Sequence, residues 1–176
     1  MPLNLIKKYP ELLDIVSLSE RGRITSLKRI FKRDIEDNSE FCFRTKVIRP
    51  IAKEDGKASM DTLFHHLITR KMIDEKGKKL KTRIFDIHRS QRLHWIKFHT
   101  EEKKQDKVNI FSCKERIDGK DRIRTYIYDI EESYVIILEP QRKGLDYYLL
   151  TAYYINEESE KQNIKKKSKR KLSEVI

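Results

Sequence analysis

The sequence has 176 residues, enough for one domain and too few for two without a visible boundary. Charged residues make up 39% and hydrophobic residues 38%, and the aromatic side chains spread along the chain exclude a wholly disordered protein. The formal net charge is +12, and residues 1–155 carry 33 basic and 24 acidic side chains, a surplus of +9. Such a surplus favours a polyanion partner, most simply nucleic acid; a basic surface without a partner is the alternative.

Several functional classes are excluded by what the sequence lacks. No apolar run approaches the ~20 residues that span a bilayer, and the first residues lack the apolar core of a signal peptide. We therefore expect a soluble, cytoplasmic protein with no membrane partner. Cys42 and Cys113 are far apart and have no metal-ligand spacing, which predicts neither a disulfide nor a zinc site. The glycine motifs that bind nucleotide phosphates are missing, and no cofactor is expected.

The N-terminal segment predicts helices. Pro10 suits the first turn of a short helix with a small apolar face. Ser17 and Glu20 have the spacing of a capping box. The segment that follows is basic apart from one apolar stripe, which predicts an amphipathic helix over 21–35. We expect this helix mainly to pack on the core, with phosphate contacts as a secondary role.

Residues 41–51 predict a strand that Pro50 ends, and the dipeptide Asp55-Gly56 predicts a turn, either of a hairpin or of a strand-turn-helix passage. From Ser59 onward, the apolar spacing predicts a short helix.

The charged stretch 73–83 predicts a turn, and the spacing over 84–102 predicts a helix for which Asp86 is the N-cap. Four strand-forming segments then alternate with turns and predict an antiparallel meander. These segments are 108–113, 122–130, 134–139 and 147–155.

The element order predicts an α+β fold, with N-terminal helices packed on one face of a four-stranded antiparallel sheet in the C-terminal half. The other face of this meander should be open to a ligand. We expect one domain over 1–155, with helices and a hairpin in 1–58 and the core in 59–155. Residues 156–176 form a basic tail, either a charged helix extension or a frayed arm.

Alternation along two of the predicted strands places arginine and tyrosine side chains on one face. The sets that share a face are Arg122, Arg124, Tyr126 and Tyr128 in one strand, and Tyr147, Leu149, Thr151 and Tyr153 in the other. Guanidinium groups pair with phosphate and tyrosine rings stack on bases, so such a face suits RNA. The alternative is that these residues are present simply because they form strands.

Five stretches of the second half carry a resemblance: FHHL at 64–67, FDIHRSQRLHWI at 85–96, RTYIYD at 124–129, YVIILEPQR at 134–142 and YYLLTAYYI at 147–155. Over about residues 61–155 the sequence resembles the barnase, EndoU, colicin and RelE superfamily of small ribonucleases, especially its phage and toxin-associated branch. The resemblance implies N-terminal helices before a four-stranded antiparallel sheet whose concave face holds the active site. Residues 59–155 would then be a nuclease-like core.

The resemblance also implies a reaction, metal-independent cleavage of RNA by attack of the ribose 2′-hydroxyl on the adjacent phosphorus. Thr151 and Tyr153 match the Thr-x-Tyr of the EndoU group, where this pair is implied to contact the nucleotide and support the scissile phosphate. The reaction requires a general base, a general acid and a cation that stabilises the developing negative charge.

Histidine suits both proton transfers because its unperturbed pKa lies near working pH. The candidates are His65, His66, His88, His94 and His99. We prefer His66, because the resembling toxins tend to have a histidine directly before leucine here, and His88, because it lies beside Arg89 and Arg92. A structural or merely exposed histidine is the alternative for each.

Arginine side chains are the candidates for binding phosphate. Arg89 and Arg124 are predicted to stabilise the scissile phosphate, with a structural salt bridge as the alternative for both. The predicted nucleic-acid-binding residues are Arg92, Tyr126, Tyr128 and Arg142.

The leading hypothesis is an endoribonuclease of toxin or phage-defence type that cleaves tRNA or mRNA, with an acidic antitoxin or immunity protein as a further partner. One alternative is a non-catalytic module that binds RNA or DNA through the same basic face. The other is a structural or regulatory protein, one half of a toxin and antitoxin pair. Convergence of two histidines, a basic residue and Thr151 in one pocket would favour the enzyme.

Overall fold

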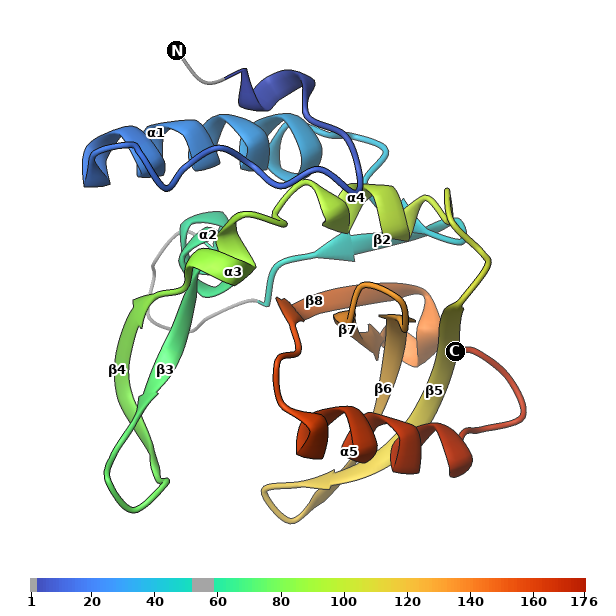
Figure 1. The fold of residues 1–176 in the computed structure, drawn as a ribbon. Coiled ribbons are helices and arrows are strands. Elements are labelled where there is room, and N and C mark those ends of the chain that lie inside the picture. Colours follow the sequence, from blue (N-terminus) through green and yellow to red (C-terminus); the bar gives the residue numbers. More distant parts are fainter. Residues whose placement is uncertain (1–2, 52–58) are drawn as a thin grey trace.

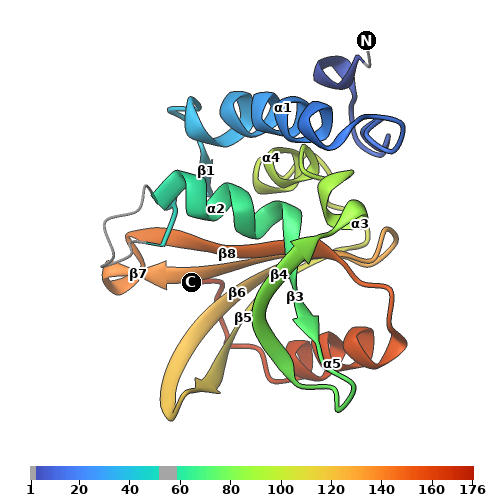
Figure 2. The same ribbon diagram turned by 90° about the vertical axis from the view of Figure 1, so that its left-hand side faces the viewer.

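The computed structural model describes residues 3–51 and 59–176 (Figures 1 and 2). Its centre is a six-stranded sheet with the order β1-β2-β8-β7-β6-β5, in which β2 and β8 are parallel and all other neighbours antiparallel. The strands are β1 (Cys42–Phe43), β2 (Lys46–Arg49), β5 (Val108–Ile117), β6 (Lys120–Asp129), β7 (Tyr134–Gln141) and β8 (Asp146–Tyr154).

The structure is α+β, but the predicted four-stranded antiparallel sheet is wrong. Two short strands from the N-terminal half extend the sheet to six and make it mixed. β2 pairs with β8 at only two positions, Ile48 with Tyr147 and Arg49 with Tyr148. A pairing this short leaves no alternating pattern from which the sequence could predict it.

Helices lie on both faces of the sheet (Figure 1). They are α1 (Glu20–Phe31), α2 (Ser59–Ile68), α3 (Ile87–Ser90), α4 (Trp95–Thr100) and α5 (Glu158–Lys169), with shorter turns η1 (Asn4–Ile6), η2 (Lys32–Glu36) and η3 (Arg142–Gly144). β3 (Thr69–Ile73) and β4 (Lys79–Phe85) form a separate two-stranded ribbon.

The sheet separates two apolar cores. Ile136 and Leu138 of β7 pack in the core that also contains side chains of α1, α2 and α4, whereas Val135 and Ile137 pack in a second core with Ile164 of α5. The sheet face expected to be open is therefore covered by α5. The predicted tail cannot pack independently, but the buried Ile164 and hydrogen bonds of α5 with Tyr126 and Tyr153 attach it to this face.

The helix predicted after Pro10 does not form. The backbone there makes long-range hydrogen bonds instead: the Leu13 N–H donates to the carbonyl of Gln91 at 3.0 Å, and the Trp95 indole N–H donates to the carbonyl of Glu11 at 3.2 Å. Because these bonds satisfy polar groups that a helix would otherwise pair, tertiary contacts outweigh the local preference.

The strand predicted over 41–51 is two strands joined by a tight turn. Arg44 and Thr45 have φ angles of 47° and 71°, which is the left-handed pair that a two-residue hairpin turn requires. The predicted Asp55-Gly56 turn lies outside the described residues.

Four further expectations concern element boundaries. The N-cap of α1 is Ser19, which accepts a hydrogen bond from the backbone of the first turn, and not Ser17. The predicted turn at 73–83 contains much of β4, and the predicted helix over 84–102 is divided into α3 and α4. The predicted N-cap Asp86 is confirmed.

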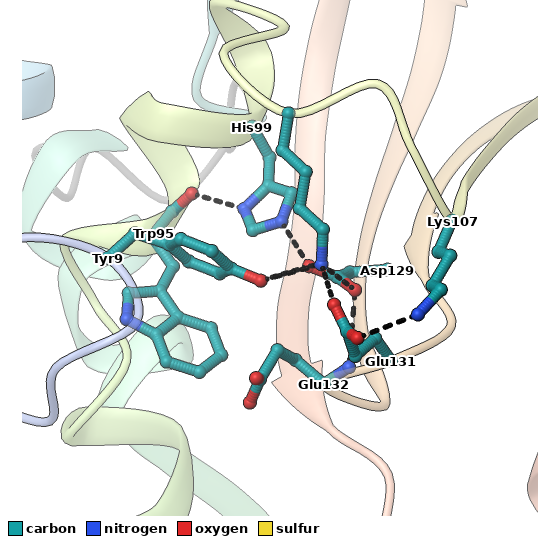
Figure 3. Close-up of polar contacts among 8 residues, drawn as sticks. Tyr9, Trp95, His99, Lys107, Asp129, Glu131 and Glu132 are labelled. Atoms are coloured by element: carbon teal, nitrogen blue, oxygen red, sulfur yellow. Dashed lines mark hydrogen bonds and ion pairs between the residues drawn. The ribbon is translucent and has the colours of Figure 1, made fainter.

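A buried carboxylate connects the N-terminal segment, α4 and the end of β6 (Figure 3). Asp129 is 0% exposed and accepts hydrogen bonds from the Tyr9 hydroxyl at 2.8 Å and the His99 ring at 2.9 Å. The Lys104 ammonium lies 3.0 Å from Asp129 and 2.9 Å from Glu131. Burial alone would raise the pKa of Asp129, but the hydrogen bonds from His99, Tyr9 and Lys104 outweigh it and hold that pKa below its usual value.

Replacing Asp129 should destabilise the fold strongly. We expect Asp129→Asn to lower the free energy of unfolding by about 3 kcal/mol or more, because Lys104 and His99 then lose a buried charged partner. The matched control is Glu131→Gln, which removes the exposed carboxylate that contacts the same lysine and should cost much less stability. Urea denaturation at pH 7 measures both variants.

The contribution of Asp129 to the free energy of unfolding should depend on pH. A carboxylate with a depressed pKa stabilises the folded state above its unfolded pKa of about 3.9 and loses that contribution as the pH falls from there toward the folded pKa. Equal losses of unfolding free energy in Asp129→Asn and Glu131→Gln at pH 7 would contradict the role of Asp129.

His94 should make the fold sensitive to mild acid. Its side chain is 6% exposed, and burial lowers its pKa to about 4, with only partial compensation from Asp34 and Glu11. The unfolded histidine binds a proton near pH 6.5, so stability falls as the pH decreases from about 6.5 to 4. We expect a loss of about 2 kcal/mol between pH 7 and pH 5, absent in His94→Gln. If the urea midpoints of His94→Gln and the wild type change in parallel between pH 7 and pH 5, this role of His94 is disproved.

Candidate functional site

The second half of β8 lies under α2 and α3 at an edge of strand pairing (Figure 2). β2 pairs with β8 only at Tyr147 and Tyr148, so within the described residues no strand continues this pairing beside Thr151. Helix α3 takes that position and contacts Thr151 through Arg89. The edge thus brings together α2, α3 and β8, which are distant in the sequence.

An irregularity in β8 decides which way its side chains point. Ile137 pairs with Thr151 whereas Leu138 pairs with Leu149, so Leu150 is an extra residue in β8. Leu149 consequently faces the core beneath α1, α2 and α4, and Thr151 shares the face of Ile137, on the side of α5. The predicted strict alternation is wrong here, because a bulge leaves no trace in the hydrophobic pattern.

Arg89 is the central side chain of the site. Its Nη1 donates to the Thr151 hydroxyl at 3.3 Å and to the carbonyl of His66 at 3.1 Å. Its guanidinium carbon lies 5.2 Å from the centre of the Tyr153 ring. The position of Arg89 follows from its own helix, since Asp86 caps α3 by accepting a hydrogen bond from the Arg89 backbone N–H.

Two further arginines flank Arg89. Arg83 of β4 donates to the hydroxyl and carbonyl of Thr69, both at 2.8 Å, and to the carbonyl of His66 at 3.4 Å. Arg92 donates to the carbonyl of His88 at 2.8 Å, and its guanidinium carbon lies 4.2 Å from the centre of the Tyr154 ring. Backbone carbonyl oxygens of α2 and α3 thus attract these cations without neutralising them.

The three arginines carry positive charge that no carboxylate balances at ion-pair distance among the described residues. Burial lowers the pKa of Arg89, and Asp86 and the neighbouring tyrosines compensate only in part. Burial also lowers the pKa of Arg92, and burial followed by repulsion from Arg89 lowers that of Arg83. A guanidinium stays protonated at neutral pH, so the cluster is a site where an anion would be stabilised.

Two of the five histidines lie at this cluster. His66 is half-buried on α2 and contributes its carbonyl to Arg89 and Arg83, and His88 is exposed on α3 with its ring 5.8 Å from the ring of Tyr154. His65 is exposed on α2, while His94 and His99 are buried in and beside α4. The backbone carbonyl of His66 and the ring of His88 therefore lie beside the arginines that contact Thr151 and Tyr154.

The hydroxyl of Tyr153 points to α5. It donates a hydrogen bond to Glu160 at 2.8 Å, and burial together with the Glu160 carboxylate raises the pKa of Tyr153 above its ordinary value. Tyr153 is thus a neutral phenol at physiological pH, fixed in position beside Arg89 by a bond to the helix that covers the sheet.

The remaining predicted residues lie elsewhere. Tyr126 and Tyr128 are 1% and 8% exposed beneath α5, and the Tyr126 hydroxyl bonds to Glu115 and Lys167. Arg124 is half-buried, 4.0 Å from Glu139. A buried ring cannot stack on a base, so neither tyrosine is carried into the functional proposal.

Arg142 is also distant from the cluster. It lies in η3 before β8, and its guanidinium forms an ion pair with Asp146 at 2.8 Å. Arg142 and Thr151 are on opposite halves of the β7–β8 pairing, so they cannot contact one phosphate.

Sequence reasoning missed Arg83, Thr69 and Tyr154. The stretch around Gly77 is predicted above as a turn alone, although Lys79, Lys81 and Arg83 alternate with Leu80, Thr82 and Ile84 after it. A hairpin centred on this glycine places Arg83 opposite Lys71 and diagonal to Thr69.

Comparison with protein-family models, curated proteins and solved structures finds no match for this chain. In residues 3–51 and 59–176, no group of three or more His, Cys, Asp or Glu side chains could hold a metal ion. The helices of this part are all too short or too polar to cross a membrane.

An anion should bind at the arginine cluster. We expect inorganic phosphate at about ten times its Kd to raise the melting temperature by about 4 °C, and Arg89→Gln to abolish the rise. Arg21→Gln, which removes an exposed arginine on α1, should leave the rise unchanged. If the Arg89 variant retains the full shift, the anion binds elsewhere. Differential scanning fluorimetry measures all three proteins.

Proposed function

We propose that the protein is an endoribonuclease that cleaves RNA at the arginine cluster by attack of the ribose 2′-hydroxyl. The observation that supports it most directly is a cluster of three arginines, Arg83, Arg89 and Arg92, that have no carboxylate at ion-pair distance among the described residues, with Arg89 bonded to the hydroxyl of Thr151. A phosphodiester supplies the negative charge that such a cluster stabilises. A toxin-type role, with tRNA or mRNA as target and an acidic antitoxin or immunity protein as inhibitor, belongs to the same proposal.

Each part of the reaction has a candidate group at the site. Arg89 binds a non-bridging oxygen of the scissile phosphate, and the Thr151 hydroxyl donates to the same group as negative charge develops on it. One histidine of the pair His66 and His88 accepts the proton of the 2′-hydroxyl, whose oxygen attacks phosphorus. The other histidine protonates the departing 5′-oxygen, which leaves a 2′,3′-cyclic phosphate and a free 5′-hydroxyl.

The covered sheet face weighs against the alternative of a non-catalytic single-strand-binding module. Such modules stack bases on exposed aromatic side chains, and here Tyr126 and Tyr128 lie beneath α5. The remaining basic site is small and combines a hydroxyl with two histidines. These groups suit a reaction at one phosphate better than the binding of several successive bases.

Cleavage should persist in EDTA. We expect total RNA incubated with the purified protein and excess EDTA to yield fragments that end in 2′,3′-cyclic phosphate, because every group in the mechanism is a protein side chain. Sequencing of the fragment ends measures this. Activity that disappears in EDTA and returns with magnesium would refute the mechanism.

Substitutions at the site should separate catalysis from folding. His66→Ala and His88→Ala should each lower kcat about 100-fold or more, the usual effect of losing a general acid or base. Their melting temperatures should stay close to that of the wild type. His65→Ala, on the same helix but exposed, should leave kcat unchanged. If His65→Ala and His66→Ala behave alike, the histidine assignment is wrong.

A further inference from the structure

The β3–β4 ribbon extends away from the body of the molecule (Figures 1 and 2). It is not part of the six-stranded sheet, and its two strands pair only with each other. The ribbon begins directly at the end of α2, and the Asp86 N–H donates to the carbonyl of Ile68 at its base. Its base therefore adjoins the arginine cluster while its far end reaches into solvent.

The ribbon is strongly basic. Residues 69–85 contain seven Lys and Arg and only Asp74 and Glu75 as acidic residues. Arg70 forms an ion pair with Asp86 at 3.8 Å. Five exposed lysines have no ion-pair partner in the part of the chain that the structure describes: Lys71, Lys76, Lys78, Lys79 and Lys81.

The basic side chains continue into the proposed active site. Lys71 pairs directly with Arg83, so these two side chains share one face of the ribbon. Ile73 pairs with Lys79 beyond an irregularity in the register of the two strands. Arg83 donates to the carbonyl of His66, which also accepts a hydrogen bond from Arg89. The basic surface of the ribbon thus continues through Lys71 and Arg83 to Arg89 beside Thr151.

This arrangement does not stabilise the ribbon itself. Two like charges opposite each other in a strand pair are destabilising, and a two-stranded hairpin is marginally stable on its own. Ile73 and Leu80 are 54% and 37% exposed, so little apolar burial offsets this repulsion. A bound polyanion would remove the repulsion, because each phosphate neutralises a lysine.

We propose that the β3–β4 ribbon binds the RNA backbone that flanks the scissile phosphate. The inference rests on the proposed function, because the basic face ends at the site where that phosphate would bind. The seven residues of β4 extend about 23 Å, which corresponds to about seven nucleotide steps at the rise of a duplex. An RNA longer than this contacts the ribbon and the site together, whereas a dinucleotide reaches the site alone.

Binding of an uncleavable RNA tests the ribbon independently of catalysis. The probe is a fluorescein-labelled 20-nucleotide RNA with 2′-O-methyl groups, which cannot be cleaved by 2′-hydroxyl attack. Fluorescence anisotropy across a series of KCl concentrations gives the affinity and its salt dependence. We expect the triple variant K71Q/K79Q/K81Q to bind at least 10-fold more weakly at low salt and to reduce the slope of log K against log salt by about 2, the effect of losing three phosphate contacts.

The matched control is K165Q/K166Q/K169Q, which removes the same charge from exposed positions on α5. Its affinity and slope should stay near those of the wild type. Equal losses in the two triple variants, or an unchanged ribbon variant, would overturn the proposal. An unchanged ribbon variant would also be the outcome if the lysines bind an acidic protein instead. Melting temperatures verify that both variants are folded.

Cleavage assays separate this inference from the proposed function. The ribbon variant should lose kcat/KM on a 20-nucleotide RNA about 10-fold and keep it on a dinucleotide substrate, which cannot reach the lysines. If the probe binds through the ribbon but no RNA is cleaved, the nuclease proposal fails and the ribbon inference stands. If long RNA is cleaved equally by variant and wild type, the ribbon inference fails and the nuclease proposal stands.

Discussion

The helical layer is held on the sheet by one carboxylate that is removed from water. Asp129 ends β6, and the groups that donate to it come from the N-terminal segment, from α4 and from the loop before β5. A buried charge is stable only when its partners are all in place, so these three segments are fixed together. α3 directly precedes α4 in the chain, and the location of Arg89 therefore depends on the same bonds.

The site arises where regular structure ends. Parallel pairing of β2 with β8 covers two positions, and beyond it α3 takes the place of a strand. The extra residue Leu150 then turns Thr151 toward the second core, where Arg89 reaches it from the neighbouring helix. Neither feature has a pattern in the sequence, because both result from how a short pairing and a bulge are placed in three dimensions.

Charge is balanced on the sheet face that α5 covers and unbalanced at the three arginines. α5 supplies Glu160 to Tyr153 and Lys167 to Glu115, so the face that it covers is locally balanced. Among the residues that the structure describes, Arg83, Arg89 and Arg92 contact carbonyl oxygens, hydroxyls and aromatic rings but form no ion pair. The uncompensated charge disfavours the folded protein alone and favours a complex with an anion, as is common where stability and binding compete.

The sequence by itself determined the helix that begins near Ser59, the Asp86 cap and the strand-forming segments of the C-terminal half, because periodicity and capping depend on residues close in the chain. It also gave Arg89, Thr151 and the two histidines as candidates for the site, through a resemblance and through residue chemistry. Only the tertiary structure decided that the sheet has six strands, that α5 covers the tyrosine face, and that Arg83 joins the site. These three features depend on contacts between segments that are distant in the sequence. Such contacts are stabilised by burial of apolar side chains and by hydrogen bonds, and no local sequence pattern predicts them.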